Sequence, residues 1–148
     1  MFIIGERING MFRAVAKAIS ERDAEAIADL ARRQVEAGAN ALDINTGPTE
    51  GDPVDVMRWL VETVEAAVEV PVCVDSPTGP VLESGLQAAK RPAIINSTTG
   101  AKERLDAQMP LAVKYGASLI GLTIDERGIP RNAEARAEIA LTIIARAM

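Results

Sequence analysis

The fold of this chain is decided by a segment that reads Val35-Glu36-Ala37-Gly38-Ala39-Asn40-Ala41-Leu42-Asp43-Ile44-Asn45. It combines the end of a helix, a glycine turn and an apolar strand that finishes in polar residues. The first part of this pattern recurs as Val113-Lys114-Tyr115-Gly116-Ala117-Ser118-Leu119-Ile120. The two segments therefore predict equivalent points of a repeated helix-turn-strand unit.

Five segments have the composition of buried strands, and each of them ends in a carboxylate, an amide or a hydroxyl. The predicted strands are Phe2–Glu6, Ala41–Asn45, Val70–Ser76, Ala93–Ser97 and Ser118–Asp125. In a parallel α/β fold the carboxyl ends of the strands lie at one edge, where small molecules bind. We therefore expect one mouth surrounded by Glu6, Asp43, Asn45, Asp75, Asn96, Thr123 and Asp125.

Helical patterns fill the gaps between these strands. Asp23 is typical of an N-cap and Pro53 of a first helical turn. We expect helices over residues 24–37, 53–69, 80–86, 102–115 and 133–148, the fourth kinked or split at Pro110. Strands that alternate with helices imply a parallel sheet covered by helices. An open doubly wound sheet would be complete at 148 residues, whereas a (β/α)₈ barrel typically needs about 250.

Composition excludes several classes of function. The 48% hydrophobic content is sufficient for the core of one ordinary domain, and the net charge of −5 argues against nucleic-acid binding. No apolar run approaches the roughly 20 residues that span a bilayer, so we expect a cytoplasmic protein without a membrane segment. The single cysteine, Cys73, fits a buried core position. Because the chain has no histidine, its chemistry must use carboxylates, amides or a borrowed cofactor, and we expect no protein-bound metal.

Two polar residues at neighbouring strand ends are the strongest ligand candidates. Asp75 can accept two hydrogen bonds from adjacent N–H donors, a geometry that suits an amino-pyrimidinone ring. Asn96 offers both a donor and an acceptor, which complements the mixed edge of such a ring. We therefore expect both side chains to contact a planar heterocycle.

The other candidates have both a functional and a structural interpretation. Asp43 and Asn45 share one face of their strand, so Asp43 points inward and Asn45 lies at the rim, where each could bind a ligand or anchor a loop. The Asn9-Gly10 turn would hold Glu6 near the mouth. Ser97 begins a short polar loop on the same side, and Thr123 fits the rim. Asp125 could equally cap the turn that follows it. No phosphate-loop motif occurs.

Several of these segments together resemble the pterin-binding methyltransferases. Within that family the chain is most similar to the methyltetrahydrofolate:corrinoid/iron-sulfur protein methyltransferases of the acetyl-CoA pathway. The resemblance covers essentially the whole chain and rests on Ile3–Phe12, Ala41–Pro48, Val74–Ser76, Ile95–Thr98 and Leu119–Thr123. It implies a (β/α)₈ TIM barrel that binds methyltetrahydrofolate at its carboxyl-end mouth. The N5 methyl group would pass to cobalt(I) of a corrinoid that a partner protein carries.

The resemblance also assigns roles to residues. It implies that Asp75 and Asn96 hydrogen-bond the pterin. Asp43 and Asn45 match the second-strand motif of the family, and from their positions at strand ends we expect Asp43, Asn45, Glu6, Ser97 and Thr123 to be further substrate-binding residues. The resemblance identifies no catalytic residue in this chain. The group that contacts N5 is expected beyond residue 148.

This sequence departs from the family in its extent. It supplies about five βα units, whereas a full barrel has eight. We therefore expect residues 1–148 to form one truncated pterin-binding domain that is inactive alone. Such a domain would form homo-oligomers or be completed by another chain. Which pterin donates the methyl group, tetrahydrofolate or tetrahydromethanopterin, stays open.

Two other functions compete with methyl transfer. Dihydropteroate synthase shares the strand-end Asp and Asn, but its second-strand loop is typically rich in Gly, Ser and Thr with an arginine. The loop here reads Asn45-Thr46-Gly47-Pro48-Thr49-Glu50-Gly51, which favours methyl transfer. The remaining alternative is a non-catalytic half-barrel subunit that docks onto a partner chain.

Overall fold

Five parallel strands form an arc in a computed structural model that describes residues 1–148. They are β1 (Ile4–Asn9), β2 (Ala41–Asn45), β3 (Val72–Asp75), β4 (Ile94–Thr99) and β5 (Ser118–Leu122). The strands pair in the order β1-β2-β3-β4-β5, the same as their order in the sequence. A doubly wound sheet would reverse direction at a switch point, so this order identifies an α/β fold of the TIM-barrel type with five βα units present.

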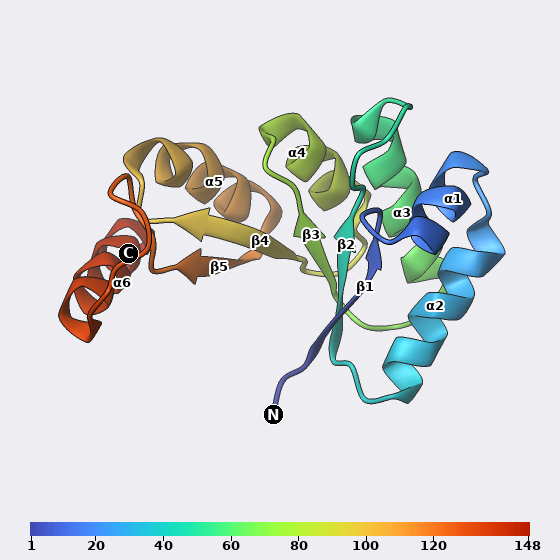
Figure 1. The fold of residues 1–148 in the computed structure, drawn as a ribbon, viewed down its shortest axis with the longest axis horizontal. Helices are drawn as coiled ribbons and strands as arrows, with labels where there is room; N and C mark the ends of the chain where they lie inside the picture. Colours follow the sequence, from blue (N-terminus) through green and yellow to red (C-terminus); the bar gives the residue numbers. More distant parts are fainter.

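Six helices follow the outer side of the arc (Figure 1). They are α1 (Arg13–Ser20), α2 (Ala24–Glu36), α3 (Pro53–Ala67), α4 (Gly79–Ala88), α5 (Lys102–Tyr115) and α6 (Ala133–Ala147). The predicted caps are confirmed, since the Asp23 carboxylate accepts from the Ala26 N–H and Pro53 opens α3. Gly116 ends α5 in the left-handed conformation that the repeated glycine turn predicted.

The hydrophobic core lies between the sheet and the helices. Strand residues such as Leu42 and Ile44 are fully buried there against residues of α3 such as Leu60 and Val64. Because side chains alternate along a strand, Asp43 lies on the opposite face of β2, away from the helices. The helices therefore cover one face of the sheet, and Asp43 lies on the other.

Four local features differ from the prediction. The sequence pattern missed α1, because its apolar stripe is short and its N-cap, Phe12, makes no side-chain hydrogen bond. β1 runs to Asn9 instead of ending at Glu6, and β5 ends at Leu122 instead of Asp125. α5 is not split at Pro110, whose ring lies on the exposed side of the helix, where water can solvate the carbonyl that loses its donor.

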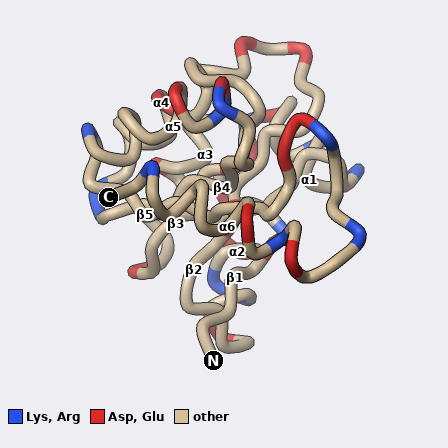
Figure 2. The backbone as a smooth tube through the Cα atoms, turned by 90° about the vertical axis from the view of Figure 1, so that its left-hand side faces the viewer, with Lys and Arg blue, Asp and Glu red and all other residues tan.

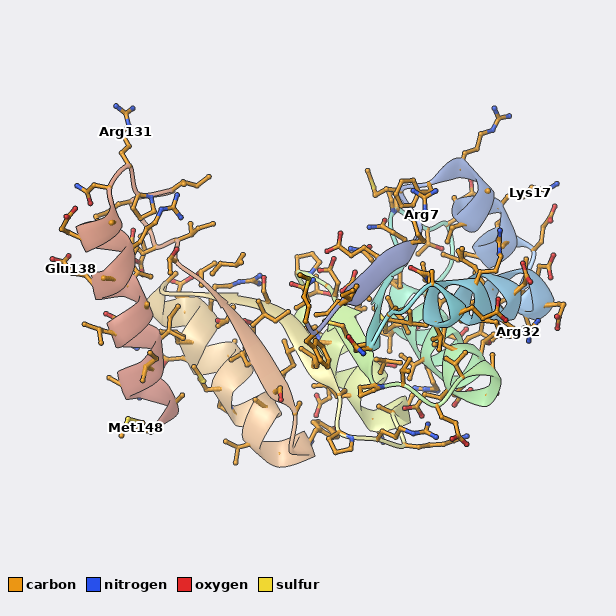
Figure 3. The ribbon with its side chains drawn as sticks, turned by 90° about the horizontal axis from the view of Figure 1, so that it is seen from below. Arg7, Lys17, Arg32, Arg131, Glu138 and Met148 are labelled. Atoms are coloured by element: carbon orange, nitrogen blue, oxygen red, sulfur yellow. The ribbon has the colours of Figure 1, made fainter.

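The two ends of the arc lie far apart. Figure 3 shows Arg131, Glu138 and Met148 of the α6 region at one end, and Arg7, Lys17 and Arg32 at the other. Acidic and basic residues are interspersed over the helical layer (Figure 2), so neither sign dominates it. None of the helices has the length and apolar character that crossing a membrane requires.

The close approach of α4 to β3 depends on a glycine. A Cβ atom on Gly85 would lie 2.7 Å from Cγ1 of Val74 and 3.0 Å from Cγ of Met57. We expect Gly85→Ala to reduce the free energy of unfolding by about 1–3 kcal/mol, because the added methyl group overpacks this contact. Denaturant unfolding measures the change. Gly79→Ala is the control, since nothing lies within 4 Å of a Cβ there, and equal stability of both variants would contradict the packing argument.

Candidate functional site

The pairing register brings four polar residues into one row across four strands. Asn9 of β1 pairs with Asn45 of β2, Asn45 pairs with Asp75 of β3, and Asp75 pairs with Asn96 of β4. In a parallel sheet this row lies toward the carboxyl ends of the strands, where TIM-barrel folds bind their ligands. The structure therefore brings the predicted residues Asn45, Asp75 and Asn96 together.

Asn9 is a member of this row that the sequence prediction missed. Its signal was present, because the dipeptide Ile-Asn occurs at Ile8-Asn9, Ile44-Asn45 and Ile95-Asn96. In each pair a buried isoleucine precedes the asparagine, and the three asparagines occupy equivalent positions in their strands. The Asn9 side chain accepts a hydrogen bond from the Met11 N–H, at 2.9 Å, and so shapes the turn after β1.

Asn45 connects its own loop to the neighbouring strand. Its Nδ2 donates to Oδ2 of Asp75 at 2.7 Å, and its Oδ1 accepts from the Gly47 N–H at 2.7 Å. The chain supplies no hydrogen bond to Oδ1 of Asp75. Asp75 can therefore accept hydrogen bonds from a ligand while Asn45 holds its other oxygen.

Asp43 is a buried carboxylate behind the row. It is 3% exposed, and its Oδ1 accepts from Nδ2 of Asn96 at 3.1 Å. The pKa of Asp43 is raised to about 6, chiefly by burial; hydrogen bonds from Asn96 and Cys73 lower it, and the charges of Asp75 and Glu6 raise it. Cys73 is fully buried, as predicted, and burial together with Asp43 raises the pKa of its thiol.

The loops after β1 and β2 touch through two glycines at the edge of the row. The Gly10 N–H donates to the carbonyl of Asn45 at 2.9 Å, and a Cβ on Gly10 would lie 2.0 Å from the carbonyl oxygen of Thr46. Gly47 has a φ of +61°, and a Cβ there would lie 2.4 Å from the backbone of Gly10. Only glycine fits at either position, so backbone packing fixes the loop that holds Asn45.

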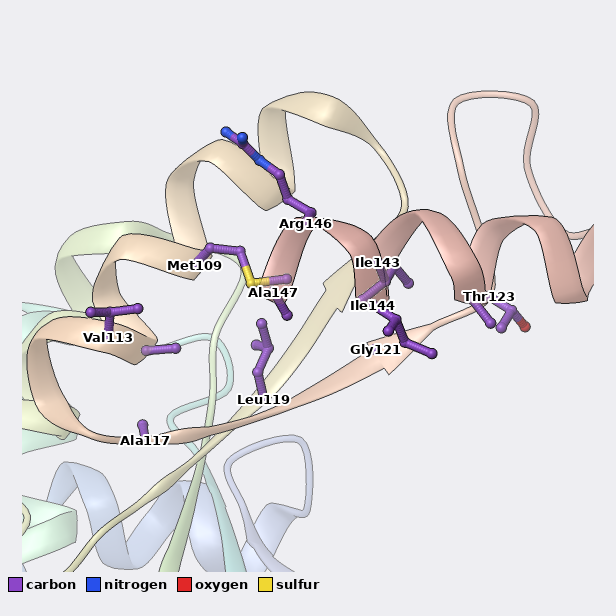
Figure 4. A pocket seen from close by; sticks show the side chains of 12 residues that line it. Met109, Val113, Ala117, Leu119, Gly121, Thr123, Ile143, Ile144, Arg146 and Ala147 are labelled. Carbon is purple, nitrogen blue, oxygen red and sulfur yellow. The ribbon is translucent and has the colours of Figure 1, made fainter.

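Besides Asp43, four predicted residues lie outside the row. Glu6 is exposed in the middle of β1, and its charge helps to raise the pKa of Asp43. Ser97 is half-buried within β4. Thr123 follows β5, accepts from Arg136 at 3.3 Å and lines a hollow beside α6 (Figure 4). Asp125 caps its turn, as the alternative interpretation held, because it accepts from the Arg127 N–H and guanidinium, which lower its pKa.

Comparison with known proteins identifies the family of the chain. A family model described as "Pterin binding enzyme" matches residues 9–146. The methylcorrinoid:tetrahydrofolate methyltransferase of Eubacterium limosum is 34% identical over 146 residues, which cover 97% of this chain and 54% of that protein. The chain belongs to the family of pterin-binding enzymes.

Other relatives in this family are larger. The methionine synthases of Mycobacterium tuberculosis and Mycobacterium leprae are each 31% identical over 150 residues, again 97% of this chain. The match covers 13% of the first and 12% of the second. The chain therefore spans about half the length of the Eubacterium relative and a small part of each methionine synthase.

The raised pKa of Asp43 predicts a pH-dependent cost of folding. The ordinary value is 3.8, so the folded chain binds the Asp43 proton more tightly than the unfolded chain, and stability falls as the pH rises from about 4 through 6. Asp43→Asn carries no charge at any pH and should be more stable than wild type by about 2 kcal/mol at pH 7. Below pH 4 this advantage should disappear. Urea unfolding at several pH values measures it.

The control for this experiment is Asp29→Asn on α2, since Asp29 is exposed and pairs with Arg33. It should not reproduce the gain in stability between pH 4 and 7. A constant difference between Asp43→Asn and wild type across this range would contradict the buried, charge-crowded environment of Asp43.

Proposed function

We propose that residues 1–148 act as one pterin-binding domain in methyl transfer between N5 of methyltetrahydrofolate and cobalt(I) of a corrinoid. A partner protein would carry the corrinoid. The observation that supports this most is the row Asn45, Asp75 and Asn96, in which Asp75 keeps one carboxylate oxygen free. It occurs at the carboxyl ends of parallel strands in a chain of the pterin-binding family.

The proposed ligand complements this row. A pterin ring carries a 2-amino group beside an N3–H group, so it presents adjacent donors to the Asp75 carboxylate. Asn96 would accept from or donate to the same polar edge through its amide. Charge-assisted hydrogen bonds from a ligand to a carboxylate are stronger than neutral ones, which gives Asp75 the larger share of the recognition.

The chemistry of methyl transfer places few demands on protein nucleophiles. The cobalt of the corrinoid is the nucleophile, and the tertiary amine at N5 needs a proton or a strong hydrogen bond as the methyl group leaves. The residues of this chain would hold and orient the pterin, which is consistent with the absence of histidine. The name of the Eubacterium relative pairs methylcorrinoid with tetrahydrofolate, the reverse direction of the same exchange, and one pterin site serves both directions.

A second candidate is a binding subunit whose barrel another polypeptide completes. It is favoured by two apolar hollows at the two ends of the arc. One, of about 570 Å³, lies between α5, β5 and α6 (Figure 4). The other, of about 480 Å³, lies between α1, α2 and the start of the chain. A dye that reports exposed apolar surface should bind this chain and be displaced when the completing polypeptide is added.

Titration calorimetry with methyltetrahydrofolate tests the proposed pterin site. We expect Asp75→Asn and Asn96→Ala to weaken binding by about 10-fold or more, because each removes a hydrogen-bonding partner of the ring. Asp125→Asn is the control. Its carboxylate caps a turn outside the row, so the affinity of this variant should stay at the wild-type value.

Turnover separates the candidate functions. A loss of the cob(I)alamin absorbance in the presence of methyltetrahydrofolate would support methyl transfer by this chain. Pterin binding without such turnover would favour the binding subunit. Formation of dihydropteroate from a pterin pyrophosphate and p-aminobenzoate would overturn methyl transfer in favour of the synthase.

A further inference from the structure

Each of two residues of β2 holds one of the proposed pterin contacts. Asn45 donates to Asp75 on the adjacent strand, and Asp43 accepts from Asn96 two strands away. Cys73 pairs with Asp43 in the strand register and lies between these strands. Because the Cys73 side chain is small and fully buried, the carboxylate of Asp43 can reach across β3 to Asn96. We call Asp43 and Asn45 the β2 clamp.

The surroundings of Asn45 fix which end of its amide faces Asp75. The Gly47 N–H can only donate, so the amide atom 2.7 Å from it must be the oxygen. The Asp75 carboxylate can only accept when ionised, so the atom 2.7 Å from it must be the nitrogen. Both neighbours require the same orientation, and rotation of the amide would create two mismatches at once.

The same reasoning applies to Asn96. Its Nδ2 faces the buried carboxylate of Asp43, which leaves its Oδ1 without a hydrogen bond from the chain. Oδ1 of Asp75 is likewise without a partner in the chain. The clamp thus leaves two free acceptor oxygens on neighbouring strands, which suits a ligand edge that presents donors.

We infer that Asp43 and Asn45 are positioning residues that fix Asp75 and Asn96 as paired acceptors, and so select a 2-amino-4-oxopteridine over a 2-oxo analogue. This inference rests on the proposed function, since it concerns how the same site recognises its ring. It departs from one of the two interpretations that the sequence left open, in which Asp43 and Asn45 touch the substrate themselves. A ring with oxygen at position 2 would place an acceptor against the acceptors that the clamp holds in place.

The first part of the test needs no ligand. In the ¹⁵N-labelled chain, the side-chain amide protons of Asn45 and Asn96 should exchange slowly with water, because each amide donates to a carboxylate. Asp75→Ala should release the amide of Asn45, and Asp43→Leu should release that of Asn96. Rapid exchange of both amides in the wild-type chain would overturn the clamp, whatever the chain binds.

The second part compares pterin (2-amino-4-oxopteridine) with lumazine (2,4-dioxopteridine) by titration calorimetry. Asn45→Ala should reduce the preference for pterin about 10-fold, because Asp75 loses the donor that holds it. Asp43→Leu should do the same through Asn96. Asp43→Asn should restore most of the preference, since its amide oxygen can still accept from Asn96.

Asn40→Ala is the matched control at the opposite end of β2. Asn40 accepts from the Ile3 N–H at 2.8 Å, so its loss removes a hydrogen bond of the same strand pair outside the row. Its preference for pterin should equal that of the wild type. Thermal melting confirms that each variant is folded before its preference is compared.

The outcomes separate the clamp from the proposed function. An unchanged pterin preference in folded Asn45→Ala and Asp43→Leu, with pterin still bound, would overturn the positioning role. A wild-type chain with slowly exchanging amides that binds neither ring would contradict the proposed function and the selection of a ring together. In that case the β2 clamp would have a structural role and no role in binding.

Discussion

The hydrogen bond from the Asn45 amide to the Asp75 carboxylate is the interaction on which the arrangement of the site depends. It exists because the parallel register places these two residues directly opposite each other on β2 and β3. The amide can keep this orientation because the Gly47 N–H holds its oxygen. Gly47 in turn keeps its place because it packs against Gly10 without a side chain on either. Backbone packing between two loops thus controls the direction of a side chain that a ligand would never need to touch.

Asp43 shows what this arrangement costs. Burial, together with the nearby charges of Asp75 and Glu6, disfavours ionisation of this carboxylate, so its pKa rises to about 6 although hydrogen bonds from Asn96 and Cys73 act in the opposite direction. An apolar residue in this position would favour folding, but it could not hold the Asn96 amide. Perturbed carboxylates of this kind concentrate at functional sites, where geometry is kept at the expense of stability.

The sequence predicted β2 to the residue but misplaced the ends of β1 and β5, and the reason is physical. β2 is bounded by a glycine turn before it and polar residues after it, so local composition defines it. The ends of β1 and β5 are set by their neighbours instead. β1 continues to Asn9 because Ile8 and Asn9 pair with Ile44 and Asn45 after an irregularity, and β5 stops at Leu122 because β4 ends at its partner, Thr99. No local pattern carries this information, so Glu6, Thr123 and Asp125 were placed at the mouth.

The same pairing explains which of the predicted residues lie together in one row. Asn45, Asp75 and Asn96 lie on β2, β3 and β4, each of which has a partner strand on both sides. Asn45 and Asp75 each pair with a residue on both neighbouring strands, and Asn96 pairs with Asp75. Thr123 and Asp125 follow β5, which has one partner and an apolar hollow beside it. The clamp therefore depends only on contacts among the inner strands and the two glycine loops. A polypeptide that paired with the free edges of β1 and β5 could complete the mouth, because the contacts that hold Asp75 and Asn96 are already present in this chain.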